Sequence, residues 1–124
     1  MTFTYKGPKA LMLLADERQI SQAVVNVIKN AIEALEKTKH PKIDVTLSKR
    51  KETAVIKIKD NGKGFDDTQD NLLKPYYTHK KTGTGLGLAI VARVMEEHGG
   101  TLKLETKNGA VITMTLPFKK EEKA

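Results

Sequence analysis

The sequence predicts an α+β domain, a two-layer sandwich in which helices cover one face of a β-sheet. Two segments, residues 17–39 and 86–98, repeat their apolar residues with the period of an amphipathic helix. Short segments around them alternate apolar and polar residues with the period of a strand. The glycine-rich residues 61–85 follow neither period, so we expect a long loop there with at most a short helix.

The first elements expected are a strand at residues 9–15 and a helix from Glu17 to about Lys39. Asp16 has the position of a helix N-cap, and Pro41 lies just beyond the expected end of the helix. The inward face of this helix consists of regularly spaced apolar residues, namely Ile20, Val24, Val27, Ile28, Ala31 and Leu35.

Two β-hairpins are expected to complete the sheet. Residues 43–47 and 55–59 flank a short polar segment, which predicts two antiparallel neighbouring strands. Residues 102–104 and 111–116 flank the turn residues 107–109 in the same way.

The second helix, residues 86–98, is expected to stop at Gly99-Gly100, because glycine commonly ends a helix. A length of 124 residues fits a single domain. We expect its core over about residues 9–117, followed by a charged tail at residues 118–124.

Composition narrows the possible functions. Cysteine is absent, so disulfides and thiolate metal sites are excluded, and no apolar run approaches the ~20 residues that span a bilayer. We therefore expect a cytoplasmic location. The net charge of +7 suits nucleic-acid binding, but the lysines are scattered and aromatic residues make up only 5%, too few for a base-stacking platform. We expect no nucleic-acid partner and attribute the charge to a solvated surface or to attraction of a polyphosphate or an acidic domain.

Two asparagines mark one side of the first helix. Asn26 and Asn30 are four residues apart, so their side chains lie on the same side, beside the apolar stripe. An amide oxygen at such a place can bind Mg²⁺, which prefers oxygen ligands. Taken alone, the pair also fits half-buried side chains that only make hydrogen bonds.

A carboxylate leads into a glycine turn at Asp60-Asn61-Gly62-Lys63-Gly64. At the end of a strand, the Asp60 carboxylate can accept a hydrogen bond from an exocyclic amine such as that of adenine. The same residues also suit an aspartate that only initiates a turn.

A second glycine cluster, Gly83-Thr84-Gly85-Leu86-Gly87-Leu88, leads directly into the second helix. Glycines allow backbone N–H groups to approach phosphate oxygens, and the helix N-terminus favours negative charge. No Gly-Lys-Ser/Thr sequence follows, so this is not a Walker loop.

Together, in this order, the three motifs resemble the catalytic and ATP-binding domain of bacterial sensor histidine kinases. This domain belongs to the superfamily of gyrase, the mismatch-repair ATPases and the large heat-shock chaperones. The resemblance covers about residues 11–117, and the segment Lys74-Pro75-Tyr76-Tyr77-Thr78-His79-Lys80 is similar to that of nitrogen-regulation sensor kinases. It implies the Bergerat ATP-binding fold, with a mixed sheet and a long ATP lid.

The resemblance also assigns roles within an ATP site. Asn30 would bind Mg²⁺, Asn26 would join the magnesium–phosphate network, and Asp60 would accept from the adenine amino group. Gly62 and Gly64 would shape the adenine side, and Lys80 would face the phosphates from the lid. The phosphate side itself would consist of Gly83, Thr84, Gly85, Leu86, Gly87 and Leu88.

Two positions depart from the family pattern. Ala110 stands where many relatives have a threonine that supports a water at the adenine site, so we expect that contact to be missing. His79 replaces the more common second threonine of the segment before the glycines.

One position distinguishes members of the superfamily. Relatives that hydrolyse ATP carry a glutamate one turn before the magnesium-binding asparagine, as the general base for water. This chain has Asn26 there, and an amide does not accept a proton at neutral pH. We therefore expect ATP binding and phosphoryl transfer with slow hydrolysis.

The resemblance implies partners outside this sequence, because no histidine here has the sequence context of a phosphoacceptor. They would be a dimerisation domain that carries the substrate histidine, and a response regulator beyond it. Membrane attachment would come only through other parts of a full-length kinase. The alternatives are a serine/threonine kinase of the anti-sigma-factor type and a non-catalytic nucleotide-binding module.

Overall fold

A computed structural model describes residues 2–6, 17–50, 53–65, 69–74 and 87–117. In chain order its elements are β1 (Thr2–Lys6), α1 (Glu17–Ala34), β2 (Lys42–Lys49), β3 (Thr53–Asp60), α2 (Gln69–Leu72), α3 (Gly87–Glu97), β4 (Thr101–Thr106) and β5 (Ala110–Pro117). Among the helices described, none is long and apolar enough to cross a membrane.

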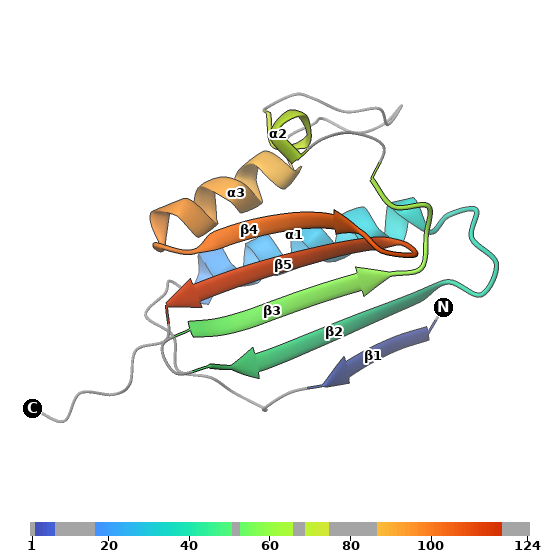
Figure 1. Cartoon of the computed structure of the whole chain (residues 1–124), viewed down its shortest axis with the longest axis horizontal. Coiled ribbons are helices and arrows are strands. Elements are labelled where there is room, and N and C mark those ends of the chain that lie inside the picture. Colours follow the sequence, from blue (N-terminus) through green and yellow to red (C-terminus); the bar gives the residue numbers. More distant parts are fainter. Residues whose placement is uncertain (1, 7–16, 51–52, 66–68, 75–86, 118–124) are drawn as a thin grey trace, which may run out of the picture.

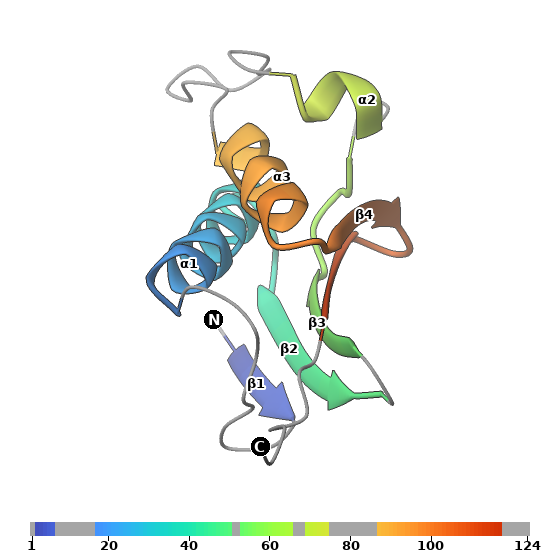
Figure 2. The same ribbon diagram turned by 90° about the vertical axis from the view of Figure 1, so that its left-hand side faces the viewer.

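The strands form one mixed sheet in the order β1-β2-β3-β5-β4. β1 runs parallel to β2, whereas the other neighbours pair antiparallel. Both hairpins predicted from the sequence are therefore confirmed. Figures 1 and 2 show α1 and α3 side by side on the same face of this sheet. The predicted α+β sandwich with a mixed sheet covered on one face is confirmed.

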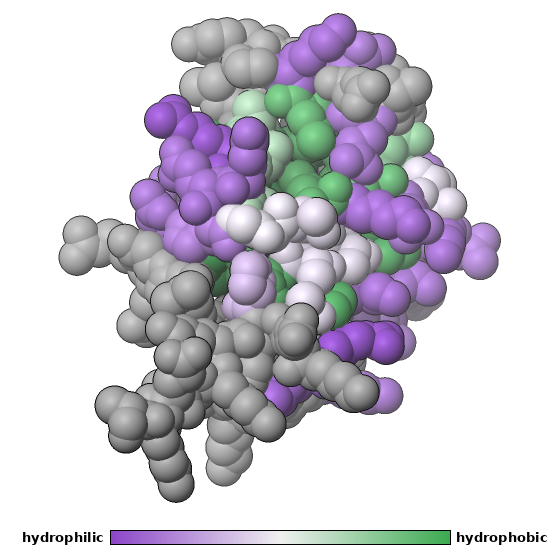
Figure 3. All heavy atoms as spheres, turned by 60° about the vertical axis from the view of Figure 1, so that its left-hand side comes forward, coloured by the Kyte–Doolittle hydropathy of each residue, from purple (hydrophilic) through white to green (hydrophobic). Residues whose placement is uncertain are grey.

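The core lies between the helices and the sheet. α1 contributes Val27, the residue directly after it is Leu35, α3 contributes Met95, and the central strands contribute Ile58 and Met114. All five are nearly inaccessible to solvent. Burial of such side chains contributes about 1.5–3 kcal/mol each. On the face seen in Figure 3, hydrophobic atoms lie in a central band between hydrophilic flanks, so this face shows the margin of the core.

The structure differs from the prediction at the start of the sheet. β1 is formed by Thr2–Lys6, a segment that the sequence analysis did not assign to a strand. The strand expected at residues 9–15 and the N-cap expected at Asp16 lie outside the described residues. β1 stands at one end of the strand order, paired with β2, so it is an edge strand. Its sequence TFTYK alternates threonine with aromatic residues, which are enriched in strands, so a signal for this strand is present in the sequence.

The prediction that the first helix extends to about Lys39 is wrong, because α1 ends at Ala34. Beyond it the N–H of Glu36 donates to Glu33 O and that of Thr38 to Leu35 O, so the chain continues in tighter turns. His40 then takes a left-handed backbone conformation with φ of 53°. The lysine-rich residues 36–39 have good helix propensity but no core contact beyond Leu35, and propensity alone does not hold a helix in water.

The segment 61–85, predicted as a long loop, contains the short helix α2 in its described part. Gln69 attaches α2 to the edge strand β4 through its side-chain amide. Its Nε2 donates to Leu102 O at 2.9 Å, and its Oε1 accepts from Leu104 N at 2.9 Å. The amide thus pairs with a strand edge as a neighbouring strand does.

Candidate functional site

The site is formed where α1, the end of β3 and the start of α3 meet. Asn26 and Asn30 lie on α1 and are both half-buried. Asp60 is the last residue of β3, and Gly62 and Gly64 follow it. Gly87 and Leu88 open α3. The other predicted site residues lie outside the described part of the chain, as does His79; they are Lys80, Gly83, Thr84, Gly85 and Leu86.

Asn30 faces the N-terminus of α3. A Cβ atom added to Gly87 would lie 3.5 Å from Asn30 Nδ2 and 3.8 Å from Asn30 Oδ1. The first turn of α3 contains no acidic side chain, so its N–H groups and helix dipole favour an external anion. The structure therefore brings an amide suited to a hard cation next to a helix start suited to phosphate.

Asp60 is buried, with only 4% of its surface exposed. Its Oδ1 accepts two backbone hydrogen bonds, from Gly62 N at 2.9 Å and from Ala110 N at 3.1 Å. The first of these is the hydrogen bond of an aspartate that initiates a turn. Both use the same oxygen, so Oδ2 keeps its capacity to accept from a ligand.

Gly62 packs the turn after Asp60 against the end of α1, the helix that carries Asn30. A Cβ atom on Gly62 would lie 3.2 Å from Ala34 O and 3.4 Å from Leu35 Cδ2, at the end of α1. Ala34 is one helical turn after Asn30, a rise of about 6 Å along the helix axis. The carboxylate turn and the asparagine are therefore held at a fixed spacing by one helix.

Gly64 is packed against β4. A Cβ atom there would lie 2.4 Å from Thr106 Cγ2, and the neighbouring Phe65 N donates to Thr106 Oγ1 at 3.0 Å. This contact fixes the direction in which the chain leaves β3. Nothing in the sequence pattern links Thr106 to the glycine turn, since forty-one residues separate Thr106 from Phe65.

The turn between β4 and β5 presses against Asp60 from the other side. Gly109 has φ of 129°, and a Cβ atom on it would lie 2.0 Å from Asp60 O. Lys107 N closes the turn by donating to Gly109 O at 2.8 Å. Only glycine fits here, because an added methyl group would collide with backbone rather than with a movable side chain.

We predict that Gly109→Ala lowers the free energy of unfolding by about 1–3 kcal/mol, the usual cost of overpacking. Chemical denaturation measures this loss. Gly87→Ala is the matched control, since its nearest neighbour would be at 3.5 Å and it should cost little or nothing. Equal stability of Gly109→Ala and the wild type would contradict the close contact with Asp60.

Two contacts at this strand end were not predicted, one to the Asp60 carboxylate and one from its neighbour Asn61. Ala110 was considered only for its side chain, but its backbone N–H binds Asp60 whatever the side chain is. Asn61 was treated only as a turn residue, although its side chain binds the backbone of residues 40 and 42. An asparagine directly after a strand is a signal for such side-chain pairing.

Comparison with known families identifies one match over most of the chain. Residues 15–120 match the family described as histidine kinase-, DNA gyrase B- and HSP90-like ATPases.

Curated relatives include a nitrogen regulation protein and a sensor histidine kinase. The chain is 41% identical over 125 residues to nitrogen regulation protein NtrY of Azorhizobium caulinodans, with 94% of this chain and 16% of that protein covered. It is 40% identical over 103 residues to sensor histidine kinase ZraS of Escherichia coli K12, with 82% of this chain and 22% of that protein covered. The chain thus spans less than a quarter of either relative.

Solved structures share the fold. The nucleotide-free catalytic domain of histidine kinase ThkA superposes with a TM-score of 0.83 at 28% identity, covering 94% of this chain and 80% of that domain. The mycobacterial sensor histidine kinase MprB superposes with a TM-score of 0.81 at 26% identity, covering 95% and 82%.

Proposed function

The chain belongs to the family of histidine kinase-, DNA gyrase B- and HSP90-like ATPases, and we propose that it binds Mg-ATP and donates the γ-phosphoryl group to a histidine on a separate dimerisation domain. One observation supports this most directly. Asp60 is a buried carboxylate with an available oxygen, and Gly62, two residues after it, contacts Ala34, which lies one helical turn along α1 from Asn30. Asn30 itself faces the start of α3. The hydrogen-bond acceptor for the base, Asp60, and the phosphate end at Asn30 and the start of α3 are therefore held at a fixed distance from each other.

The residues divide between the two ends of the nucleotide. Asp60 Oδ2 accepts the adenine amino group, and Gly62 and Gly64 hold that side in place. Asn30 supplies an oxygen ligand for magnesium, with Asn26 one turn away on the same helix. Backbone N–H groups at Gly87 and Leu88 face the phosphates. The resemblance adds Lys80, Gly83, Thr84, Gly85 and Leu86 to this side.

The chain positions the reacting groups rather than activating water. Bound magnesium would neutralise charge on the phosphates, which is the main requirement of phosphoryl transfer. Asn26 carries an amide, which does not take a proton from water at neutral pH. We therefore propose that bound ATP persists until an acceptor histidine docks.

The partners follow from the same proposal. The substrate histidine belongs to a dimerisation domain, and a response regulator receives the phosphoryl group afterwards. We also propose a cytoplasmic location for this domain, with any membrane attachment made through other parts of a longer kinase.

We predict that Asn30→Ala weakens binding of a non-hydrolysable ATP analogue about tenfold or more when Mg²⁺ is present, because an oxygen ligand is lost. Binding of ADP in the presence of a chelator should change less than twofold. Calorimetry with both ligands measures the difference. If metal-free ADP weakens as much as the Mg-ATP analogue, the substitution has damaged α1 in general.

A further inference from the structure

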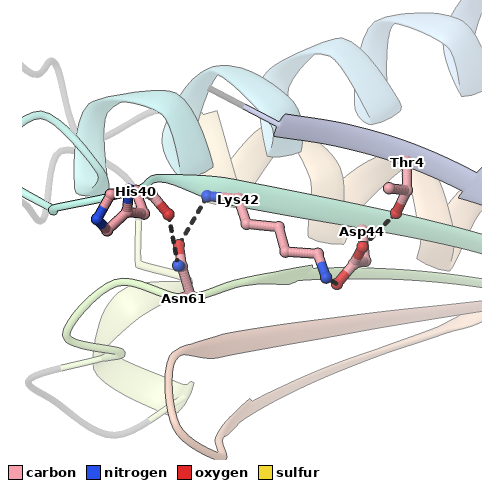
Figure 4. Close-up of polar contacts among 5 residues, drawn as sticks. All are labelled: Thr4, His40, Lys42, Asp44 and Asn61. Carbon is pink, nitrogen blue, oxygen red and sulfur yellow. Dashed lines mark hydrogen bonds and ion pairs between the residues drawn. The ribbon is translucent and has the colours of Figure 1, made fainter.

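Asn61 joins the end of β3 to the segment between α1 and β2. Its Nδ2 donates to His40 O at 3.0 Å, and its Oδ1 accepts from Lys42 N at 2.8 Å. Its own N–H donates to Lys42 O at 3.3 Å. Figure 4 shows the Asn61 amide between His40 and Lys42, with a hydrogen bond at each end.

These bonds continue the pairing of β2 with β3 past the point where the ladder ends. The last register pair of the two strands is Ile43 with Asp60. Beyond that pair, the Asn61 side-chain amide makes hydrogen bonds to the backbone of His40 and Lys42, as the backbone of a further strand residue would. Asp60 is thus held within a paired segment instead of at a loose strand end.

The exposed position of Asn61 indicates that its side-chain hydrogen bonds contribute to local geometry more than to stability. Both of its side-chain hydrogen bonds are in contact with solvent, where water can replace them, so neither is needed to satisfy a buried group. Such bonds add little to stability but fix the local geometry. Here the fixed element is the backbone next to the Asp60 carboxylate.

Asp60 is held from the β5 side by Ala110 N and by the close approach of Gly109. On the β2 side, within the described residues, the side-chain contacts beyond the ladder come from Asn61. Without them, the chain beyond the Ile43–Asp60 pair would be held to β2 by the Asn61 N–H alone, and a shift of the strand end there would turn Oδ2 about the bonded Oδ1. A hydrogen bond weakens steeply once the angle at its hydrogen falls below about 120°.

We infer that Asn61 is a positioning residue for base recognition: it holds the strand end so that Asp60 Oδ2 faces the exocyclic amine of adenine. This inference rests on the proposed function. It separates Asn61 from residues that only support the fold, because its loss should affect the amino group of the base rather than the nucleotide as a whole.

The test compares two ligands that differ only at the amino group. ADP and purine riboside 5′-diphosphate, which carries hydrogen in place of the 6-amino group, are titrated by calorimetry into the full chain. The wild type should prefer ADP about 10- to 100-fold, as expected for a hydrogen bond to a charged group. Asn61→Ala should reduce this preference about three- to tenfold, while binding of the analogue without the amino group changes less than twofold.

The matched control is Gln69→Ala. Gln69 also makes two side-chain hydrogen bonds to the backbone of a strand, but at the β4 edge. Its removal should leave the preference for ADP unchanged. Asn61→Asp provides a second variant in case Asn61→Ala unfolds: it keeps an acceptor for Lys42 N but loses the donor to His40 O, so the preference should still fall.

The outcomes separate the inference from the proposed function. If the wild type prefers ADP and Asp60→Asn abolishes the preference, but neither Asn61 variant changes it, Asn61 does not position the carboxylate. Equal weakening of both ligands in the Asn61 variants overturns the inference as well, since it indicates general damage. If the wild type binds both ligands equally, base recognition by Asp60 itself is wrong.

Discussion

Mixed with a separate dimeric domain that carries a phosphoaccepting histidine, this chain is expected to transfer label from γ-labelled Mg-ATP to that domain. Incubated alone, it should acquire almost no stable label. His40 is exposed in the turn after α1, and His98 directly follows α3, with its Nδ1 at 2.7 Å from Val94 O. Neither lies at the start of α3, the part of that helix that faces Asn30, and His79 lies outside the described residues.

Transfer in trans should be slow, because two surfaces must dock before the reacting atoms come into line. Gel autoradiography over time measures the label on each component. Asn30→Ala should reduce the rate about tenfold or more through weaker magnesium and phosphate binding. The Gln69→Ala variant is the control: it leaves the proposed magnesium and phosphate ligands unchanged, so its rate of transfer should stay close to that of the wild type.

The nature of the product distinguishes the possible reactions. A phosphohistidine loses its label in acid, whereas a phosphoserine keeps it. An acid-stable product would favour the serine/threonine kinase alternative. Rapid release of free phosphate without any acceptor would contradict the role assigned to Asn26, since it would show that a general base is present.

The helices and strands that bury one face could be predicted from the sequence, because their apolar residues repeat with the period of the element. The stripe from Ile20 to Leu35 and the alternation in the two hairpins follow from burial on one side, and these elements are confirmed. β1 and the end of α1 were not predicted. The alternation of threonine with aromatic residues in TFTYK is a strand signal that was not used, whereas residues 36–39 favour a helix that no core contact holds.

In the candidate site, too, some residues could be predicted from the sequence and others could not. Motif order predicted that Asn30, Asp60 and Gly87 form one site. In the structure Gly87 lies beside Asn30, and Gly62, two residues after Asp60, contacts the end of α1. The contacts of Thr106, Gly109 and Asn61 could not be predicted, since each depends on which strands are neighbours and in which register. Tertiary pairing, and not local propensity, determines them.

The second large effect is expected from Asp60→Asn, which changes one atom of the carboxylate and keeps its shape. The amide oxygen of the variant can still accept from Gly62 N and Ala110 N at the Oδ1 position. Nδ2 is then forced into the Oδ2 position, where a donor faces the donor amine of adenine. ADP binding should weaken by about 1.5–3 kcal/mol, the contribution of a hydrogen bond to a charged group.

The same exchange predicts a change in base preference. In the wild type, guanine O6 would face the Asp60 carboxylate, two acceptors in contact, so GDP should bind far more weakly than ADP. In Asp60→Asn the amide donor faces O6 instead, and the preference for ADP over GDP should fall at least about tenfold.

Asp44→Asn is the control for this exchange, because it makes the same chemical change at the neighbouring strand. Asp44 accepts from the Thr4 hydroxyl and lies 3.9 Å from Lys42 Nζ, and it is half-exposed rather than buried (Figure 4). It pairs with Lys59 and not with Asp60, so it lies on the opposite face of the sheet from the candidate site. Its substitution should leave both nucleotide affinities within twofold. Calorimetry of the two nucleotides with the wild type and both variants decides the question: an unchanged ADP:GDP ratio in Asp60→Asn would show that this carboxylate closes the turn through Oδ1 and does not read the base.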